Sequence, residues 1–389
     1  MTSAVPPFVF NTTRSVQFGP GKLQLLGELV RGIAGSRVLL VTDPGMLKTG
    51  IVERGLKSLE AAGVTASVFS EVEADPPEAV VHRAAYAARS LSAEGIVAIG
   101  GGSSLDVAKL VAVLAKGEET LKDMYGIGKV KGPRLPLILV PTTAGTGSEV
   151  TPISIVTTGT SEKMGVVSPV LLPDIALLDP DLTLGLPPHI TAATGIDAMV
   201  HAIEAYASVN ANNNPVSRIL AVEALTLMGR SLLTAVHDGG NVAARSDMLL
   251  GSMLAGQAFA NSPVAAVHAL AYPLGGHFHI PHGLSNALVL PHVLRFNMVV
   301  APGPYAELAP IVFPDLARLE GHERAAAFCD RLAALSKATG LPQTLADMKI
   351  PRDFLPKLAS DAMNQTRLLG NNPRPVTEAD ALAIYTAAY

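Results

Sequence analysis

The chain has 389 residues, of which 49% are hydrophobic and 4% aromatic, and it carries a formal net charge of −4. This length predicts a large buried core in one or two domains. Acidic and basic residues are scattered, and no run of Lys or Arg favours binding to nucleic acid. The single cysteine, Cys329, excludes an intrachain disulfide and fits a reducing compartment.

Two segments bear on targeting and on the membrane. The amino terminus, MTSAVPPFVF, lacks the basic segment and the long apolar segment of a signal peptide. Residues 248–294 contain no Asp, Glu, Lys or Arg, but Pro, Gly, Asn and His interrupt them, so they do not resemble a membrane-spanning helix. We therefore expect a cytoplasmic protein without a membrane span.

Short β-branched runs alternate with amphipathic stretches in the first half of the chain. This rhythm predicts a mostly parallel sheet with helices on both faces. The expected strands cover residues 37–43, 65–70, 95–100, 135–143, 153–158, 164–167 and 174–179, and the expected helices cover residues 50–62 and 78–91 and begin again near Ser104.

The rhythm stops at LTLGLPPHI, and the rest of the chain is predicted to be mostly helical. We therefore expect an α/β domain over residues 1–186 and an all-α domain over residues 187–389. The helices expected there cover residues 192–208, 217–236, 241–260, 264–272 and 284–296, with several more towards the carboxyl terminus.

Four residues of the second half can bind one divalent metal: Asp197, His201, His268 and His282. The first two lie four residues apart in TGIDAMVHAIEAY, a spacing that places both side chains on one helix face. Three imidazoles and one carboxylate suit Fe(II) or Zn(II) and can leave a position open for water or substrate. The sequence therefore predicts a metal-dependent enzyme.

The other two candidate ligands bracket the string HALAYPLGGHFHIPHG. We expect a helix to end near Pro273, a turn to follow at residues 275–276, and Pro281 to present the histidine after it. Five of the ten histidines lie in the uncharged stretch, where polar rings require partners. Two of them, His277 and His279, are the competing candidates for the same metal.

Two polar loops follow strands of the predicted sheet. GGGSSLDVAK opens a helix directly after a strand, where backbone N–H groups and the helix dipole favour a phosphate, although the string lacks the GxGxxG fingerprint. PTTAGTGSEVTP follows another strand at the sheet edge where doubly wound folds bind ligands. Taken alone, the first loop is equally consistent with a tight connection between a strand and a helix. The second is consistent with a turn whose hydroxyl groups bond to its own backbone.

The strings GGGSSLDVAK, PTTAGTGSEVT, GIDAMVHAIEAY and HALAYPLGGHFHIPHGLSNALVLPHVLRFN resemble the iron-containing (group III) alcohol dehydrogenase family over nearly the whole chain. The resemblance implies an amino-terminal dinucleotide-binding domain, a helical domain and a catalytic cleft between them. It assigns the metal to the same four residues and demotes His277 and His279. It also implies NAD contacts by Gly100, Gly101, Gly102 and Ser103 at the pyrophosphate, by Asp43 at the adenine ribose, by Thr142, Thr143, Thr146 and Ser148 at the nicotinamide end, and by Lys163 and Leu182 at two further positions.

One position departs from the family near the chemistry. Many members have a histidine four residues after the third metal ligand, where this chain has Tyr272. Together with His282, Tyr272 is therefore expected to act in catalysis, as a proton relay or as part of the substrate pocket. Tyrosine also occurs at this position in hydroxyacid–oxoacid transhydrogenases, which makes that activity the main alternative. A maleylacetate reductase-like enzyme is a further alternative.

The sequence thus predicts reversible oxidation of an alcohol to an aldehyde or ketone with NAD and a bound iron, or with zinc in its place. Ile153, Phe259 and Phe278 are expected to shape a pocket for a small, partly apolar substrate. A purely structural metal site is the non-catalytic alternative, but such sites commonly contain cysteines, and none lies near this one. The amino-terminal FVFNTTRSVQFG segment suggests a homodimer, and a higher homo-oligomer is the alternative.

Overall fold

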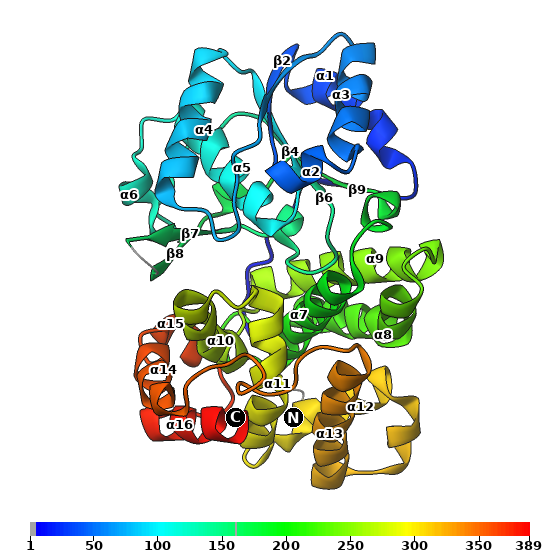
Figure 1. The fold of residues 1–389 in the computed structure, drawn as a ribbon, viewed down its shortest axis with the longest axis vertical. Helices are drawn as coiled ribbons and strands as arrows, with labels where there is room; N and C mark the ends of the chain where they lie inside the picture. Colours follow the sequence, from blue (N-terminus) through cyan, green and yellow to red (C-terminus); the bar gives the residue numbers. More distant parts are fainter. Residues whose placement is uncertain (1–4, 160–161) are drawn as a thin grey trace. The chain divides into compact units, whose positions relative to one another are not determined.

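The computed structural model describes residues 5–159 and 162–389, which form two compact units. The first unit contains residues 11–185 and is built around a sheet (Figure 1). The second contains residues 186–389 together with residues 5–10. The early segment joins the second unit because the backbone N–H and C=O of Val9 both bond to the side chain of Asn212, at 2.8 and 2.9 Å.

A six-stranded parallel sheet forms the centre of the first unit, in the order β1-β9-β6-β4-β2-β3. Its strands are β1 (Ser15–Phe18), β2 (Arg37–Val41), β3 (Thr65–Phe69), β4 (Gly95–Gly100), β6 (Leu137–Pro141) and β9 (Ile175–Leu178). The helices that pack on it are α1 (Leu26–Ile33), α3 (Ile51–Ala61), α4 (Glu78–Ser90) and α5 (Gly102–Lys116). The single-turn helix α2 (Pro44–Leu47) lies between β2 and α3 in the chain.

The apolar residues of each buried strand alternate between two cores because successive side chains of a strand point to opposite faces. In β2, Val38 and Leu40 belong to the core beneath α1 and α3, whereas Leu39 and Val41 belong to the core beneath α4 and α5. Figure 1 shows these helix pairs on opposite faces of the sheet. Both faces are therefore covered, as the continuous apolar runs predict.

Two of the expected strands lie outside the central sheet. They are β7 (Ile153–Thr158) and β8 (Glu162–Val167), which pair antiparallel in a separate three-stranded sheet, with the two-residue β5 (Gly126–Ile127) on the other side of β8. The mostly parallel sheet is thus confirmed, but these two strands extend a different layer.

The elements described in the second unit, apart from its turns, are helical. The longest helix, α8, packs most closely on its two sequence neighbours. The helices are α7 (Pro188–Ala207), α8 (Pro215–His237), α9 (Val242–Asn261), α10 (Ala266–Phe278), α11 (His282–Met298), α12 (Pro302–Val312), α13 (Gly321–Ala338), α14 (Leu355–Ala362), α15 (Thr366–Leu369) and α16 (Glu378–Ala387).

The helix end expected near Pro273 is wrong. Helix α10 continues through Pro273 to Phe278, and Gly275 and Gly276 are part of it. The chain turns instead at His279, which has a left-handed backbone with φ 53° and whose N–H bonds to the carbonyl of Gly275 at 3.0 Å. A proline removes only one helix hydrogen bond, which the packing of a largely buried helix can outweigh.

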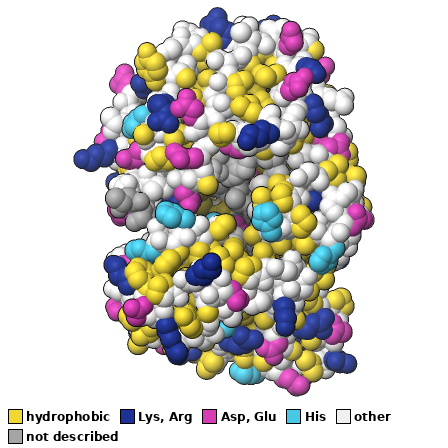
Figure 2. Space-filling view, viewed as in Figure 1, with side chains coloured by type: hydrophobic (Ala, Val, Ile, Leu, Met, Phe, Trp, Pro, Cys, Tyr) yellow, Lys and Arg dark blue, Asp and Glu magenta, His cyan; other side chains and the backbone are white. Residues whose placement is uncertain are grey.

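The surface carries charges of both signs, and one helix is apolar over most of its length. On the face in view in Figure 2, acidic and basic side chains are interspersed without a large patch of one sign. Among the described helices, only α8 is long and apolar enough to cross a membrane by length and composition, and half of its apolar window is buried inside the protein. Core helices pass the same test, so α8 is weak evidence for a membrane span.

Candidate functional site

The four predicted metal ligands come together in the helical unit. Asp197 and His201 lie one turn apart on α7, His268 lies near the start of α10, and His282 is the first residue of α11. One ligand atom from each residue lies within 4.8 Å of the others. Three segments far apart in the sequence therefore place three imidazoles and one carboxylate around one point.

A glycine allows α11 to approach α7 closely enough for this cluster to form. A Cβ on Gly283 would lie 2.4 Å from the backbone oxygen of Ala193 and 3.2 Å from the Cβ of Asp197. Only glycine fits so close a contact between helix backbones. The contact holds the neighbouring His282 with its Nε2 3.7 Å from Asp197 Oδ1.

The cluster is buried on one side and open on the other. Asp197, His201 and His268 are at most 5% exposed, whereas the side chain of His282 is 39% exposed. The ring of His201 stacks between Phe259, at 4.3 Å, and His268, at 4.7 Å. Burial acts to raise the pKa of Asp197, but the three neighbouring histidines and the amide of Asn286 together lower it by more. The net result is a lowered pKa, which keeps this carboxylate ionised.

Two residues that the sequence reasoning missed contact this cluster. Glu204 is buried on α7, and its Oε2 lies 2.6 Å from Nδ1 of His268. Asn286 is buried on α11, and its Nδ2 donates to Oδ1 of Asp197 at 2.6 Å. The helical periodicity contained the signal, because Glu204 lies seven residues after Asp197 and Asn286 four after His282, on the same faces.

The two competing histidines lie elsewhere. His277 Nε2 is 2.7 Å from a carboxylate oxygen of Asp361, and its ring packs edge-on against Phe354. His279 is the left-handed residue that ends α10. Neither belongs to the group of residues that could hold a metal ion among those described.

Tyr272 lies one helical turn after His268 on α10, and its ring centroid is 5.9 Å from that of His282. Its side chain is half-buried. It is therefore close enough to the open side of the cluster to touch a molecule there.

Most of the predicted cofactor residues follow strands of the central sheet at its carboxyl edge, in the other unit, whereas Lys163 lies on β8 of the three-stranded sheet. Asp43 follows β2, Gly100 ends β4 and Thr142 follows β6, and β4 pairs with both other strands. Doubly wound sheets bind ligands at this edge. The helix after the glycine loop starts at Gly102, earlier than expected, with Gly101 at its N-cap, so its first N–H groups are not capped by a side chain.

The two polar loops contact each other directly. The N–H of Thr142 donates to the carbonyl of Gly100 at 3.0 Å. A Cβ on Gly102 would lie 2.8 Å from the side chain of Thr146, and one on Gly101 would lie 3.7 Å from Thr143. A side chain at Gly102 would therefore displace Thr146, whereas one at Gly101 would make only an ordinary contact with Thr143. Ser103 is half-buried in the first turn of α5.

Asp43 uses one carboxylate oxygen locally. Its Oδ1 accepts from the N–H groups of Gly45 and Met46, capping the short helix α2. Its Oδ2 lies 3.5 Å from the position that a Cβ on Gly100 would take. One oxygen of Asp43 thus faces the glycine loop.

Ser148 differs from the other loop residues because it belongs to a buried charged network. Its hydroxyl donates to Asp106 at 2.5 Å and accepts from Nζ of Lys109 at 2.7 Å. Lys109 is fully buried and also donates to the carbonyl of Ile153 at 2.6 Å. The hydroxyl of Ser148 therefore ties its loop to α5, which leaves it poorly placed to bond to a cofactor directly.

The last two predicted cofactor residues have structural contacts of their own. Nζ of Lys163 lies 2.6 Å from Asp75 Oδ1 and 3.0 Å from the hydroxyl of Thr157. Leu182 is 2% exposed and belongs to the core beneath α1 and α3.

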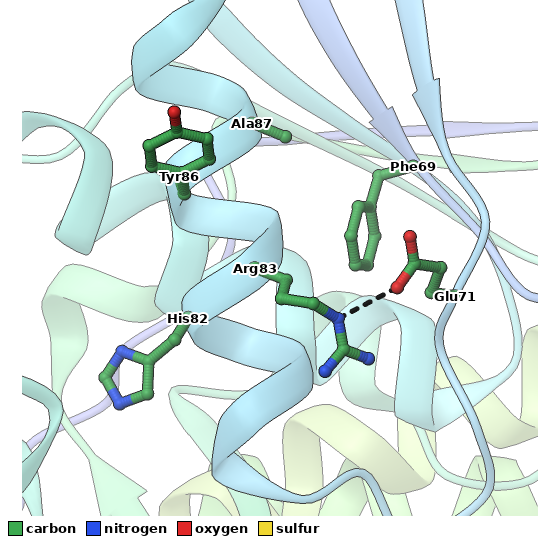
Figure 3. Close-up of a pocket in the computed structure, with 6 residues that line it drawn as sticks. All are labelled: Phe69, Glu71, His82, Arg83, Tyr86 and Ala87. Atoms are coloured by element: carbon green, nitrogen blue, oxygen red, sulfur yellow. Dashed lines mark hydrogen bonds and ion pairs between the residues drawn. The ribbon is translucent and has the colours of Figure 1, made fainter.

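A separate surface pocket of about 450 Å³ lies between β3 and α4 (Figure 3). Arg83 on α4 reaches Glu71, with Nε 2.8 Å from the carboxylate, beside the ring of Phe69. The described residues that line this pocket include none of the predicted site residues, so it is distinct from both the cluster and the loops.

The chemistry of the cluster fits a transition metal. Imidazole nitrogens and a carboxylate oxygen are ligands of Fe(II) and Zn(II), and the ionised Asp197 supplies the negative charge. The exposed side of His282 leaves room for a further ligand. The described residues therefore suit a catalytic centre better than a closed structural site.

Comparisons with known proteins agree with this arrangement. The sequence model "Iron-containing alcohol dehydrogenase" matches residues 13–180, and "Fe-containing alcohol dehydrogenase family, C-terminal" matches residues 191–389. Long-chain-alcohol dehydrogenase 1 of Geobacillus thermodenitrificans (strain NG80-2) is 42% identical over 95% of this chain and 94% of its own. The 1,3-propanediol dehydrogenase of Klebsiella pneumoniae is 37% identical over 96% of each chain. A crystal structure of a 1,3-propanediol oxidoreductase superposes with a TM-score of 0.95 at 36% identity, covering 98% of this chain and all of the other.

Proposed function

Because the chain belongs to the iron-containing alcohol dehydrogenase family, we propose that Asp197, His201, His268 and His282 hold its iron and that this centre activates the alcohol. As a member of the family, the protein is a metal-dependent oxidoreductase that interconverts an alcohol and an aldehyde or ketone with NAD. The observation that carries the proposal is the convergence of the four ligand atoms within 4.8 Å.

The reaction needs a Lewis acid at the alcohol oxygen, a site that excludes water and an acceptor for hydride. Bound iron supplies a Lewis acid that lowers the pKa of the alcohol oxygen, and zinc would supply the same chemistry. The uncharged stretch around the cluster, including the ring of Phe259 stacked on His201, excludes water from the buried side. NAD held at the carboxyl edge of the sheet would supply the acceptor for the hydride from the alcohol carbon.

We propose Tyr272 as the residue beside the departing proton. Its ring lies 5.9 Å from that of His282, on the open side of the cluster. Phenols in general have a pKa of about 10, so a tyrosine is a weaker base at pH 7 than the histidine common in the family. Tyr272 would therefore act as a hydrogen-bonding relay to water or as one wall of the substrate pocket.

The NAD residues are proposed from the carboxyl edge of the sheet. The uncapped start of α5 and the glycines that precede it suit the pyrophosphate. Asp43 suits the adenine ribose, where a carboxylate accepts from the 2′-OH and repels a 2′-phosphate. Thr142, Thr143 and Thr146 suit the nicotinamide end, whereas Ser148, Lys163 and Leu182 would contribute by shaping that edge.

A small alcohol or aldehyde is the proposed substrate class. The named relatives are a long-chain-alcohol dehydrogenase and a 1,3-propanediol dehydrogenase, so their names share an alcohol group but differ in the length of the substrate. Phe278, whose ring packs edge-on against Phe354 at 5.0 Å, provides an apolar surface on the helix that carries His268.

We also propose that the protein is cytoplasmic and forms a homodimer. Its one cysteine, Cys329, is buried, and burial raises the pKa of the thiol to about 12, which suits a thiol that stays reduced. Strand β1 ends the central sheet and leaves one edge for a second copy to pair with. Sedimentation equilibrium tests the dimer, and a single species at the monomer mass of 40.3 kDa contradicts it.

The activity is tested with protein reconstituted with Fe(II) or Zn(II). Primary alcohols of increasing chain length are supplied with free NAD, and NADH is measured by its absorbance. We expect turnover with at least one alcohol, and none after the metal is chelated. Hydride exchange between a hydroxyacid and an oxoacid without added nucleotide, with no reduction of free NAD, would instead indicate a transhydrogenase.

A further inference from the structure

The buried carboxylate of Glu204 is bound at both of its oxygens. Oε2 lies 2.6 Å from Nδ1 of His268, and Oε1 accepts the backbone N–H of Val267 at 2.7 Å. We propose that Glu204 is a positioning residue that holds His268 in the Nδ1–H tautomer and directs its Nε2 at the metal. The proposal rests on the proposed function, because it assumes that His268 is a ligand.

The two contacts of Glu204 fix the ring in both position and rotation. Val267 precedes His268 in the first turn of α10, so one carboxylate clamps the backbone and the side chain of the same turn. The carboxylate is 5% exposed, which shields both contacts from water. A charge-assisted hydrogen bond in such surroundings is stronger than one at the surface.

The opposite end of the ring lies beside an amide donor. Nδ2 of Asn286 donates to Oδ1 of Asp197 at 2.6 Å and lies 3.2 Å from Nε2 of both His268 and His282. Its two hydrogens are shared among these three acceptors, so these contacts allow a lone pair on Nε2 of His268, and the tautomer itself follows from the carboxylate of Glu204 at Nδ1.

Helix α7 thus contributes to the metal site three times. Asp197 and His201 supply ligand atoms, and Glu204, one turn further along, orients a ligand that α10 supplies. A carboxylate behind a metal-binding histidine raises the basicity of the ligand nitrogen and lowers the cost of ordering the ring. Loss of such a partner typically weakens metal binding by about 10–100-fold.

Glu204→Gln tests the inference because glutamine has only one oxygen to accept with. Either the N–H of Val267 or the Nδ1–H of His268 must then face the NH2 group of the glutamine, so one of the two hydrogen bonds is lost. We expect Zn(II) binding, measured by competition with a chromophoric chelator, to weaken by about 10–100-fold. The matched control is Glu307→Gln, whose carboxylate pairs with Arg218 and Tyr206 at the surface of the same unit; its Zn(II) affinity should equal that of the wild type.

A wild-type measurement tests the tautomer even if the variant fails to fold. In metal-free protein with 15N-labelled histidine, long-range 15N–1H spectra at pH 8 should show His268, assigned from His268→Gln, protonated at Nδ1 only. Protonation at Nε2, or an unchanged Zn(II) affinity in a folded Glu204→Gln variant, would overturn the inference. If wild-type protein binds no Zn(II), or His268→Gln binds it as tightly, the proposed metal site itself fails.

Discussion

Replacing Gly283 by alanine should damage the metal centre without touching a ligand. The new Cβ would lie 2.4 Å from the backbone oxygen of Ala193, and backbone cannot swing aside as a side chain can. Relief to an ordinary contact of roughly 3.4 Å moves α11 away from α7 by about 1 Å. His282 directly precedes Gly283, so its Nε2 moves relative to Asp197, from which it is now 3.7 Å.

The expected size follows from opposing effects. Overpacking costs about 1–3 kcal/mol, and the better helix propensity of alanine offsets up to ~1 kcal/mol of it. A net loss of about 1–2 kcal/mol corresponds to a melting temperature lower by about 2–8 °C for a unit of this size. Metal sites tolerate displacements of about 0.5 Å, so Zn(II) binding should weaken by at least about tenfold.

The assay is chelator competition for Zn(II) together with thermal unfolding of the metal-free protein. Gly303→Ala is the matched control, because Gly303 also lies in a helix but has open space around its Cβ position. The control should keep the wild-type Zn(II) affinity and melt at the same temperature or slightly higher. Wild-type affinity and stability in Gly283→Ala would refute the argument that this close contact holds the site together.

Three further predictions address the proton, the cofactor and pH. Tyr272→Phe should lower kcat by roughly a hundredfold with little change in KM if the hydroxyl relays the proton. If turnover, KM and substrate preference are all unchanged, Tyr272 contributes only to packing. Asp43→Asn should keep the cap of α2 but remove the charge, raising kcat/KM for NADP relative to NAD by about tenfold; a wild-type preference for NADP would show that Asp43 is misread. Burial raises the pKa of Glu149 to about 7 from 4.5, and an unfolded chain ionises at the lower value, so the contribution of Glu149 to stability should fall as pH rises from 4.5 to 7, by up to about 3 kcal/mol. Glu149→Gln should therefore be more stable than the wild type in urea at pH 8, with the difference closing towards pH 4.5; an equal difference at both pH values would contradict this.

Local patterns were sufficient for most of the fold. β-branched runs predicted five of the six strands of the central sheet, all but the edge strand β1, because strands buried on both faces are continuously apolar. The same pattern could not show that β7 and β8 belong to a second sheet, since pairing between distant strands leaves no local signal. The sequence also misplaced the turn after His268, because the burial of α10 outweighs the effects of Pro273 and its glycines.

The sequence was sufficient to select the four proposed metal ligands, but it did not reveal the residues that contact them. Helical spacing and the uncharged stretch selected the four proposed ligands, which the structure brings together, and the family resemblance drawn from the same strings is confirmed by the matches over both halves of the chain. Glu204 and Asn286 were missed although their helical spacing from Asp197 and His282 contained a signal, because that spacing does not show which polar residue of a helix face is buried against a partner. The network around Ser148 was missed for the same reason, since Lys109 lies 39 residues away.

Metal content and activity of two histidine variants test the central claim most directly. His282→Ala removes a proposed ligand, whereas His277→Ala removes a neighbour that pairs with Asp361. Both proteins are loaded with Fe(II) or Zn(II), and bound metal and alcohol-dependent NADH formation are measured on the same samples. We predict that His282→Ala loses metal and activity together and that His277→Ala keeps its metal; full metal retention in His282→Ala, or its loss in a folded His277→Ala, would contradict the account.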